Sequence, residues 1–70
     1  MDIDILKAID AGCRKRRDIA DHVEADGDDV GRELRRMSDD GLVEYLIYWG
    51  PTGWYLTARG QRALVHALTT

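Results

Sequence analysis

The sequence predicts a mostly helical α+β domain, in which a three-helix core is followed by a C-terminal β-hairpin and a final helix. Apolar residues recur at helical spacing up to Met37, a stretch rich in β-branched and aromatic residues follows Gly41, and helical spacing returns after Thr57. A chain of 70 residues supports one hydrophobic core, because it buries only about 60% of the surface that it exposes when unfolded. We therefore expect one domain over residues 1–70.

The first helix is predicted over residues 2–11 and the second over residues 17–24. Their apolar stripes are Ile5, Leu6 and Ile9 in the first helix, and Ile19, Ala20 and Val23 in the second. Asp2 and Asp4 can cap or favour the first N-terminus, and Gly12 suits a left-handed stop. Residues 13–16 lack a helical stripe, so we expect a short extended link there.

The third helix has the strongest pattern, because its apolar residues fall four and then three positions apart. These residues are Val30, Leu34 and Met37. Asp26 is placed to cap this helix after the tight connection at residues 25–27, and Asp28 and Asp29 favour its first turn. Gly41 suits the left-handed residue of a Schellman stop, in which Leu42 packs on Met37.

A β-hairpin is predicted after the third helix, with strands at residues 42–49 and 54–56 around a turn at residues 50–53. Thr57 can cap a last helix over residues 58–68, although Gly60 stands where a capping box has Glu. The apolar residues of this helix are Leu64, Val65 and Leu68. The short turn at residues 25–27 forces a sharp angle between two helices, which indicates a helix-turn-helix followed by a wing.

Four segments resemble the pattern of winged helix-turn-helix transcription regulators, over nearly the whole chain. They are Asp18-Ile19-Ala20, Val30-Gly31-Arg32-Glu33-Leu34, Gly41-Leu42-Val43-Glu44 and Tyr55-Leu56-Thr57-Ala58-Arg59-Gly60. The Asp-rich composition and the hairpin Tyr48-Trp49-Gly50-Pro51 resemble small haloarchaeal proteins related to a halophage repressor and, more loosely, the multiple-antibiotic-resistance regulators. The resemblance implies that the third helix enters the DNA major groove, that the wing lies near the backbone or minor groove, and that the protein forms a dimer.

The net charge of −3 argues at face value against a nucleic-acid partner. Most acidic residues are Asp, however, and Lys7 and Lys15 are the only lysines, a composition that resembles salt-loving archaeal proteins. In such a protein the acidic side chains keep the chain soluble at high salt, so the net charge does not exclude a DNA partner.

The predicted DNA-facing side of the third helix lies opposite its apolar stripe. It carries Asp28, Arg32, Arg35 and Asp39, with Arg36 beside them. The planar fork of arginine can donate two bonds to guanine or grip a phosphate. Asp28 and Asp29 repel phosphate unless they accept from cytosine N4 or salt masks them. The alternative is a solvated face, stabilised by the pairs Arg32–Asp28 and Arg36–Asp40.

A second basic cluster precedes the second helix, and we expect it to contact phosphates. It consists of Arg14, Lys15, Arg16 and Arg17. The turn at residues 50–53 has no Arg or Lys, which weakens the case for a wing that clamps DNA. Four aromatic residues around it form either core and cross-strand pairs or a partner surface. They are Tyr48, Trp49, Trp54 and Tyr55.

The sequence contains no pattern typical of an enzyme, a metal site or a cofactor site. His22 and His66 are isolated, and Cys13 lacks a placed base or zinc partners. No apolar run reaches the ~20 residues of a membrane span, and Asp2 and Asp4 are unlike a signal peptide, so we expect a cytoplasmic protein.

The sequence therefore favours a small transcription regulator, a repressor, that binds double-stranded DNA sequence-specifically. We expect a homodimer through the last helix, at Leu64, Val65 and Leu68. The alternative is a winged-helix module that binds another protein and does not contact DNA. The negative net charge and the aromatic residues of the wing favour this alternative.

Overall fold

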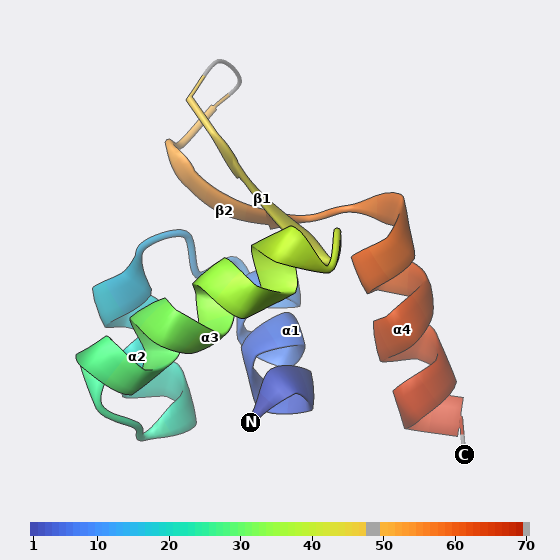
Figure 1. The fold of residues 1–70 in the computed structure, drawn as a ribbon, viewed down its shortest axis with the longest axis horizontal. Helices are drawn as coiled ribbons and strands as arrows, with labels where there is room; N and C mark the ends of the chain where they lie inside the picture. The colour runs from blue at the N-terminus through green and yellow to red at the C-terminus, as the bar shows by residue number, and fades with distance from the viewer. Residues whose placement is uncertain (48–49, 70) are drawn as a thin grey trace.

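The computed structural model describes residues 1–47 and 50–69, and it has the predicted order of elements. These are α1 (Asp2–Asp10), α2 (Arg16–Val23), α3 (Gly27–Asp39), β1 (Val43–Leu46), β2 (Gly53–Leu56) and α4 (Ala58–Thr69). In Figure 1, α2 and α4 lie at opposite ends of the molecule, and the β1–β2 hairpin projects beyond the helices. This arrangement is a winged-helix-like α+β fold, as predicted.

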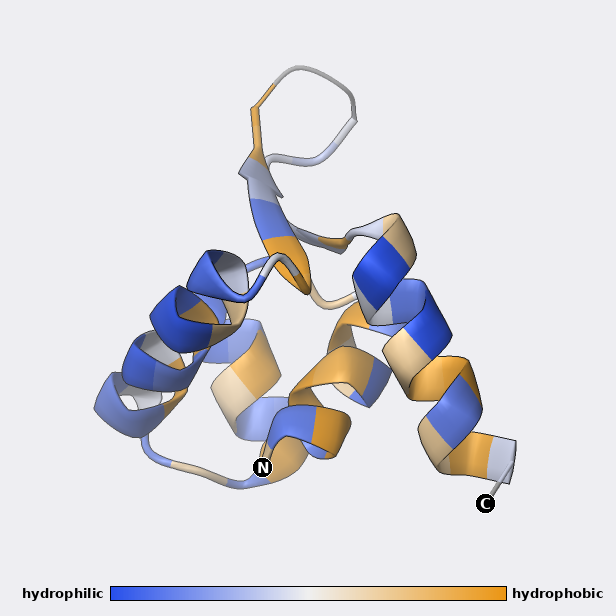
Figure 2. Ribbon diagram, turned by 45° about the vertical axis from the view of Figure 1, so that its right-hand side comes forward, coloured by the Kyte–Doolittle hydropathy of each residue, from blue (hydrophilic) through white to orange (hydrophobic). Residues whose placement is uncertain are grey.

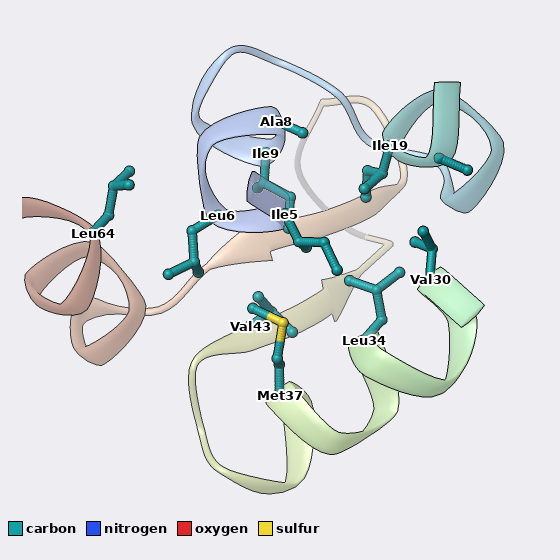
Figure 3. Close-up of a cluster of buried hydrophobic side chains, with 11 residues drawn as sticks. Ile5, Leu6, Ala8, Ile9, Ile19, Val30, Leu34, Met37, Val43 and Leu64 are labelled. Carbon is teal, nitrogen blue, oxygen red and sulfur yellow. The ribbon is translucent and has the colours of Figure 1, made fainter. Parts of the chain in front are cut away.

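The core forms where α1, α2, α3, β1 and α4 meet. Its buried apolar residues are Ile5, Leu6, Ala8, Ile9, Ile19, Ala20, Val30, Leu34, Met37, Val43 and Leu64. Figure 3 shows their side chains converging from these elements. Figure 2 shows the outer surface of α3 as mostly hydrophilic, in keeping with a helix that buries one stripe.

The predicted dimer surface on the last helix is wrong for one of its residues. Leu64 is only 2% exposed and packs in the core, whereas Val65 and Leu68 are 51% and 60% exposed. An apolar stripe cannot tell a residue that packs within the domain from one that faces outward. Leu64 is therefore not available to a partner.

Both ends of α3 have the predicted stops. The Asp26 carboxylate accepts from the backbone N–H of Asp28 at 2.8 Å and so caps the helix. At the other end Gly41 has a φ of +76°, and the backbone N–H of Leu42 donates to the carbonyl of Met37 at 2.9 Å. Together with the bond from Gly41 N–H to the Ser38 carbonyl at 3.0 Å, this is the Schellman motif. The two ends of α3 are thus set by residues in and next to the helix.

The link before α2 is shorter than predicted, because Arg16 is the first residue of the helix. Lys15 is the N-cap in extended conformation, and Arg14 lies against the hairpin. At its C-terminus α2 stops at Glu24, which adopts a left-handed conformation with a φ of 57°. This residue turns the chain sharply toward α3 and supplies the turn of the helix-turn-helix.

Thr57 joins three elements at the base of the hairpin. Its hydroxyl oxygen accepts from the backbone N–H of Gly60 at 3.0 Å, which confirms the predicted cap of α4. The same hydroxyl donates to the carbonyl of Gly41 at 2.6 Å. The backbone N–H of Thr57 also donates to the carbonyl of Leu42 at 3.1 Å. These bonds tie the start of α4 to the end of α3.

In the hairpin β1 and β2 pair antiparallel, with Tyr45 opposite Trp54. The rings of these two residues meet edge to face with centroids 5.3 Å apart, so Trp54 forms a cross-strand pair, one of the two roles predicted for it. The hydroxyl of Tyr55 donates to the carbonyl of Pro51 at 2.6 Å. The first strand ends at Leu46, earlier than predicted, and Tyr48 and Trp49 lie outside the described residues.

Candidate nucleic-acid interface

Three arginines from two helices gather at a hollow of about 370 Å³ between the start of α2 and the outer face of α3. Its lining residues are Arg16, Asp28, Gly31, Arg32 and Arg35. A second hollow of about 390 Å³ shares Arg16, Gly31 and Arg35 and extends to Trp54 at the hairpin. The two hollows form a groove along α3, which we call the arginine groove.

Gly31 explains why Arg16 belongs to this groove. A Cβ atom at Gly31 would lie 3.1 Å from Cδ and 3.2 Å from Nη1 of Arg16. The glycine therefore leaves room for the Arg16 side chain to lie across α3. Sequence reasoning did not connect the two residues, although a glycine inside a strongly amphipathic helix costs about 1 kcal/mol relative to alanine and so signals a packing reason.

Replacing Gly31 with alanine is expected to stabilise the domain by about 0.5–1 kcal/mol, because alanine loses less backbone entropy in a helix. The added methyl group displaces Arg16, which is exposed and flexible enough to move by a few tenths of an ångström. Urea unfolding followed by circular dichroism measures the change. A loss of stability would mean that Arg16 is held rigidly over α3.

The guanidinium groups of the arginine groove differ in their partners. Arg32 forms an ion pair with Asp29, one turn earlier in α3, and not with Asp28 as the sequence suggested. Within residues 1–47 and 50–69, Arg16 and Arg35 form no ion pair. Both side chains are exposed. Their charges are therefore available to an anion.

Arg36 does not line this groove. It forms ion pairs with Asp2, Glu33 and Asp40, and its Nη1 lies 2.9 Å from Oδ2 of Asp40. Hydrogen bonds from Arg36, first to Glu33 and then to Asp2, raise the pKa of its guanidinium. The pKa of Asp2 is lowered, and the largest cause is hydrogen bonding with Glu33. Arg36 lowers this pKa further, whereas burial acts in the opposite direction. Arg36 thus connects α3 to the start of α1 through neutralising contacts, including the predicted pair with Asp40.

The four cations predicted to form one phosphate-binding cluster have different surroundings. Arg14 is half-buried, and its Nη1 donates to the carbonyl of Trp54 at 2.7 Å. Its guanidinium carbon also lies 4.1 Å from the centroid of the Tyr55 ring. Arg16 lines the groove, while Lys15 and Arg17 are exposed. Arg14 is therefore part of the hairpin's attachment to the helices.

Replacing Arg14 with alanine is expected to destabilise the domain by about 1–2 kcal/mol, since a charge-assisted hydrogen bond and a stacking contact on an aromatic ring are lost. The matched control is Lys15→Ala, an exposed neighbour whose loss changes stability by no more than about 0.5 kcal/mol. Urea midpoints of both variants give the comparison. Equal midpoints would show that Arg14 does not hold the hairpin.

The remaining predicted features lie away from the arginine groove. Val65 and His66 line a shallow hollow of about 510 Å³ on α4. His22 is exposed on α2, and Cys13 is a half-buried free thiol packed against the core. Among the residues that the structure describes, no three His, Cys, Asp or Glu side chains are grouped to hold a metal ion. No helix in the described part of the chain is long and apolar enough to cross a membrane.

Comparisons with known proteins relate this fold to a regulator. No family model and no curated protein matches the sequence. The solved structure of the M. tuberculosis transcriptional regulator MosR matches 96% of this chain with a TM-score of 0.81 and 26% sequence identity. The match covers 50% of the MosR chain, so this chain spans half the length of that regulator.

A second solved structure places the same fold inside an enzyme. An O-methyltransferase from neocarzinostatin biosynthesis, NcsB1, in complex with S-adenosyl-L-homocysteine, matches 86% of this chain with a TM-score of 0.72 and 28% identity. The match covers only 19% of that enzyme. Together the two neighbours establish the regulator-like fold, and the narrower resemblance to proteins related to a halophage repressor stays a prediction.

Proposed function

We propose that this chain is a small transcription regulator that binds double-stranded DNA with α3 in the major groove. The observation that carries the proposal is the arginine groove, where Arg16 and Arg35 present guanidinium groups without carboxylate partners among the described residues. The similarity to MosR, described as a transcriptional regulator, supports the same role.

The geometry of α3 suits this role. The helix has 13 residues, about 20 Å at 1.5 Å per residue, and the major groove is about 12 Å wide and admits one helix. Its buried stripe of Val30, Leu34 and Met37 holds it on the core, so the opposite face is presented outward on a rigid support. Arg16, at the start of α2, is placed to contact a phosphate beside the same groove.

The net negative charge is compatible with this proposal. Asp2 and Asp40 are engaged with Arg36, so part of the acid is neutralised within the domain. At high ionic strength the Debye length falls to about 3 Å, which removes long-range repulsion between acidic residues and phosphates. Binding then depends on short-range contacts within the arginine groove.

The test is a fluorescence anisotropy titration of short duplexes across a range of salt concentrations. We expect Arg16→Ala and Arg35→Ala each to weaken binding about ten-fold and to reduce the salt slope by about one. Lys7→Ala on α1 is the matched control, since it removes the same charge from an exposed side chain outside both the arginine groove and α4. Absence of duplex binding by the wild type at every salt concentration of the titration, or equal binding by all four proteins, would overturn the proposal.

We also propose that residues 1–70 act as a single cytoplasmic domain that represses transcription as a homodimer. The exposed Val65 and Leu68 on α4 support a dimer contact there, without Leu64. Light scattering at high protein concentration tests it: we expect a dimeric mass that becomes monomeric in the Val65→Asp variant. A monomeric wild type would contradict the dimer and leave the DNA-binding proposal in place.

One observation favours a second candidate function, a module that binds another protein. Tyr45 and Ile47 expose apolar surface on the hairpin, where a DNA-clamping wing carries cations. This alternative requires that the wild type binds duplex DNA at no salt concentration of the titration, so the same experiment separates the two functions.

A further inference from the structure

We infer that the arginine groove reads G·C base pairs, with the Asp28 carboxylate accepting from cytosine N4 and the Arg35 guanidinium donating to guanine. The inference rests on the proposed DNA binding and adds which bases are recognised. It follows from the hydrogen-bonding groups that α3 offers and those that it lacks.

The hollow at Gly31 carries hydrogen-bonding groups complementary to those that G·C pairs present. In the major groove guanine presents two acceptors, N7 and O6, and cytosine presents one donor, N4. The hollow is lined by the donors of Arg16, Arg32 and Arg35 and by one side-chain acceptor, the carboxylate of Asp28. Because Gly31 has no side chain, Arg16 lies directly over the helix backbone and its guanidinium group joins those of Arg32 and Arg35 in the hollow.

The same surface is poorly suited to A·T pairs. Adenine is read by the side-chain amides of Asn or Gln, and the thymine methyl group by an apolar contact. The sequence contains no Asn, and its one Gln, Gln61, is on α4. No apolar side chain lines the hollow that contains Asp28, whereas Leu34 and Trp54 line the second hollow, toward the hairpin. Discrimination between the two kinds of base pair therefore follows from composition as well as geometry.

The roles of Arg35 and Asp28 follow from the partners of their neighbours. Arg32 is held by Asp29, and Arg16 lies across Gly31 from the start of α2, which leaves Arg35 as the arginine of α3 that lines the groove without an ion pair in the described structure. The Asp28 side chain is exposed and likewise forms no ion pair there. A carboxylate beside DNA is repelled by phosphates unless it accepts from a base donor, and cytosine N4 is the major-groove donor that Asp and Glu read.

Asp28 and Arg35 read different base pairs. They are seven residues apart in α3, which is about 10 Å along the helix axis and about three base-pair steps of 3.4 Å. The predicted site therefore contains a cytosine read by Asp28 and a separate guanine read by Arg35, with phosphate contact from Arg16 beside them.

The experiment begins with selection of duplexes from a random library by the wild-type protein. In the recovered site, single guanines are replaced by 7-deazaguanine, which lacks the N7 acceptor, and single cytosines by N4-methylcytosine, whose methyl group blocks the major-groove donor. Both replacements keep Watson–Crick pairing. Affinities are measured for the wild type, Arg35→Ala and Asp28→Ala, with Lys7→Ala and Asp4→Ala as matched controls. Circular dichroism verifies that each variant is folded.

We expect one guanine whose replacement weakens binding of the wild type about ten-fold or more, but does not weaken binding of Arg35→Ala. We expect one cytosine that behaves in the same way with Asp28→Ala. Both controls should respond like the wild type. Recovered sites without G·C pairs, duplex binding without base preference, or equal losses in the wild type and the variants would overturn this inference and leave DNA binding intact. Absence of duplex binding would instead overturn the proposed function.

Discussion

Replacing Gly60 with alanine is expected to destabilise the domain by about 3 kcal/mol, the upper end of the usual cost of overpacking. A Cβ atom at Gly60 would lie 2.0 Å from the carbonyl oxygen of Leu42. That oxygen accepts a hydrogen bond from Thr57, so it cannot move away without a further loss. A domain of this size is stable by roughly 3.5–10 kcal/mol, and urea unfolding followed by circular dichroism should show a large shift of the midpoint.

The matched control is Gly27→Ala, in the first turn of α3, where an added Cβ atom would meet nothing within 4 Å. This variant should be as stable as the wild type or slightly more stable, because alanine is the better helix former. If both variants unfold at the same urea concentration, the close packing of α4 on Leu42 is wrong.

Replacing Leu34 with alanine is expected to cost about 3 kcal/mol, within the range found when a buried leucine leaves a cavity. Leu34 is fully buried, between Val30 and Met37 in the stripe that holds α3 on the core. The variant should lose duplex binding at temperatures where the wild type is folded, because α3 is then no longer supported. Thermal unfolding monitored by circular dichroism measures the loss.

Leu68→Ala makes the same chemical change at a position that is 60% exposed. In the monomer it should alter stability by less than about 0.5 kcal/mol. Measurement at low protein concentration keeps any association through α4 from contributing. A similar loss for Leu34→Ala and Leu68→Ala would mean that α3 is not packed as described.

The features predicted correctly from the sequence are those that a few neighbouring residues determine. The Asp26 cap, the Gly41 stop and the Thr57 cap each depend on partners within five residues along the chain. The apolar stripes of the helices depend only on a period of 3.6 residues. Such patterns are complete in the local sequence, so they determine the elements and the core face of α3.

The features that the sequence could not predict depend on distant partners. Arg14 bonds to Trp54, 40 positions away, and Arg36 to Asp2, 34 positions away. From the sequence alone, both were arginines in basic clusters and both were expected at the DNA surface. The packed fold ties Arg14 to the hairpin and Arg36 to the start of α1, and it brings Arg16 to the face of α3. The exposed arginines of α3 were predictable, but the composition of the whole groove was not.

The hydroxyl of Thr57 couples the positions of α3 and α4. Since it bonds both the carbonyl that ends α3 and the first turn of α4, a tilt of α4 must either break one of these bonds or pull on the end of α3. The start of α4 and the end of α3 are therefore expected to move together. A contact that reorients α4 is therefore expected to act on the end of α3 through these two hydrogen bonds as well as through the shared core.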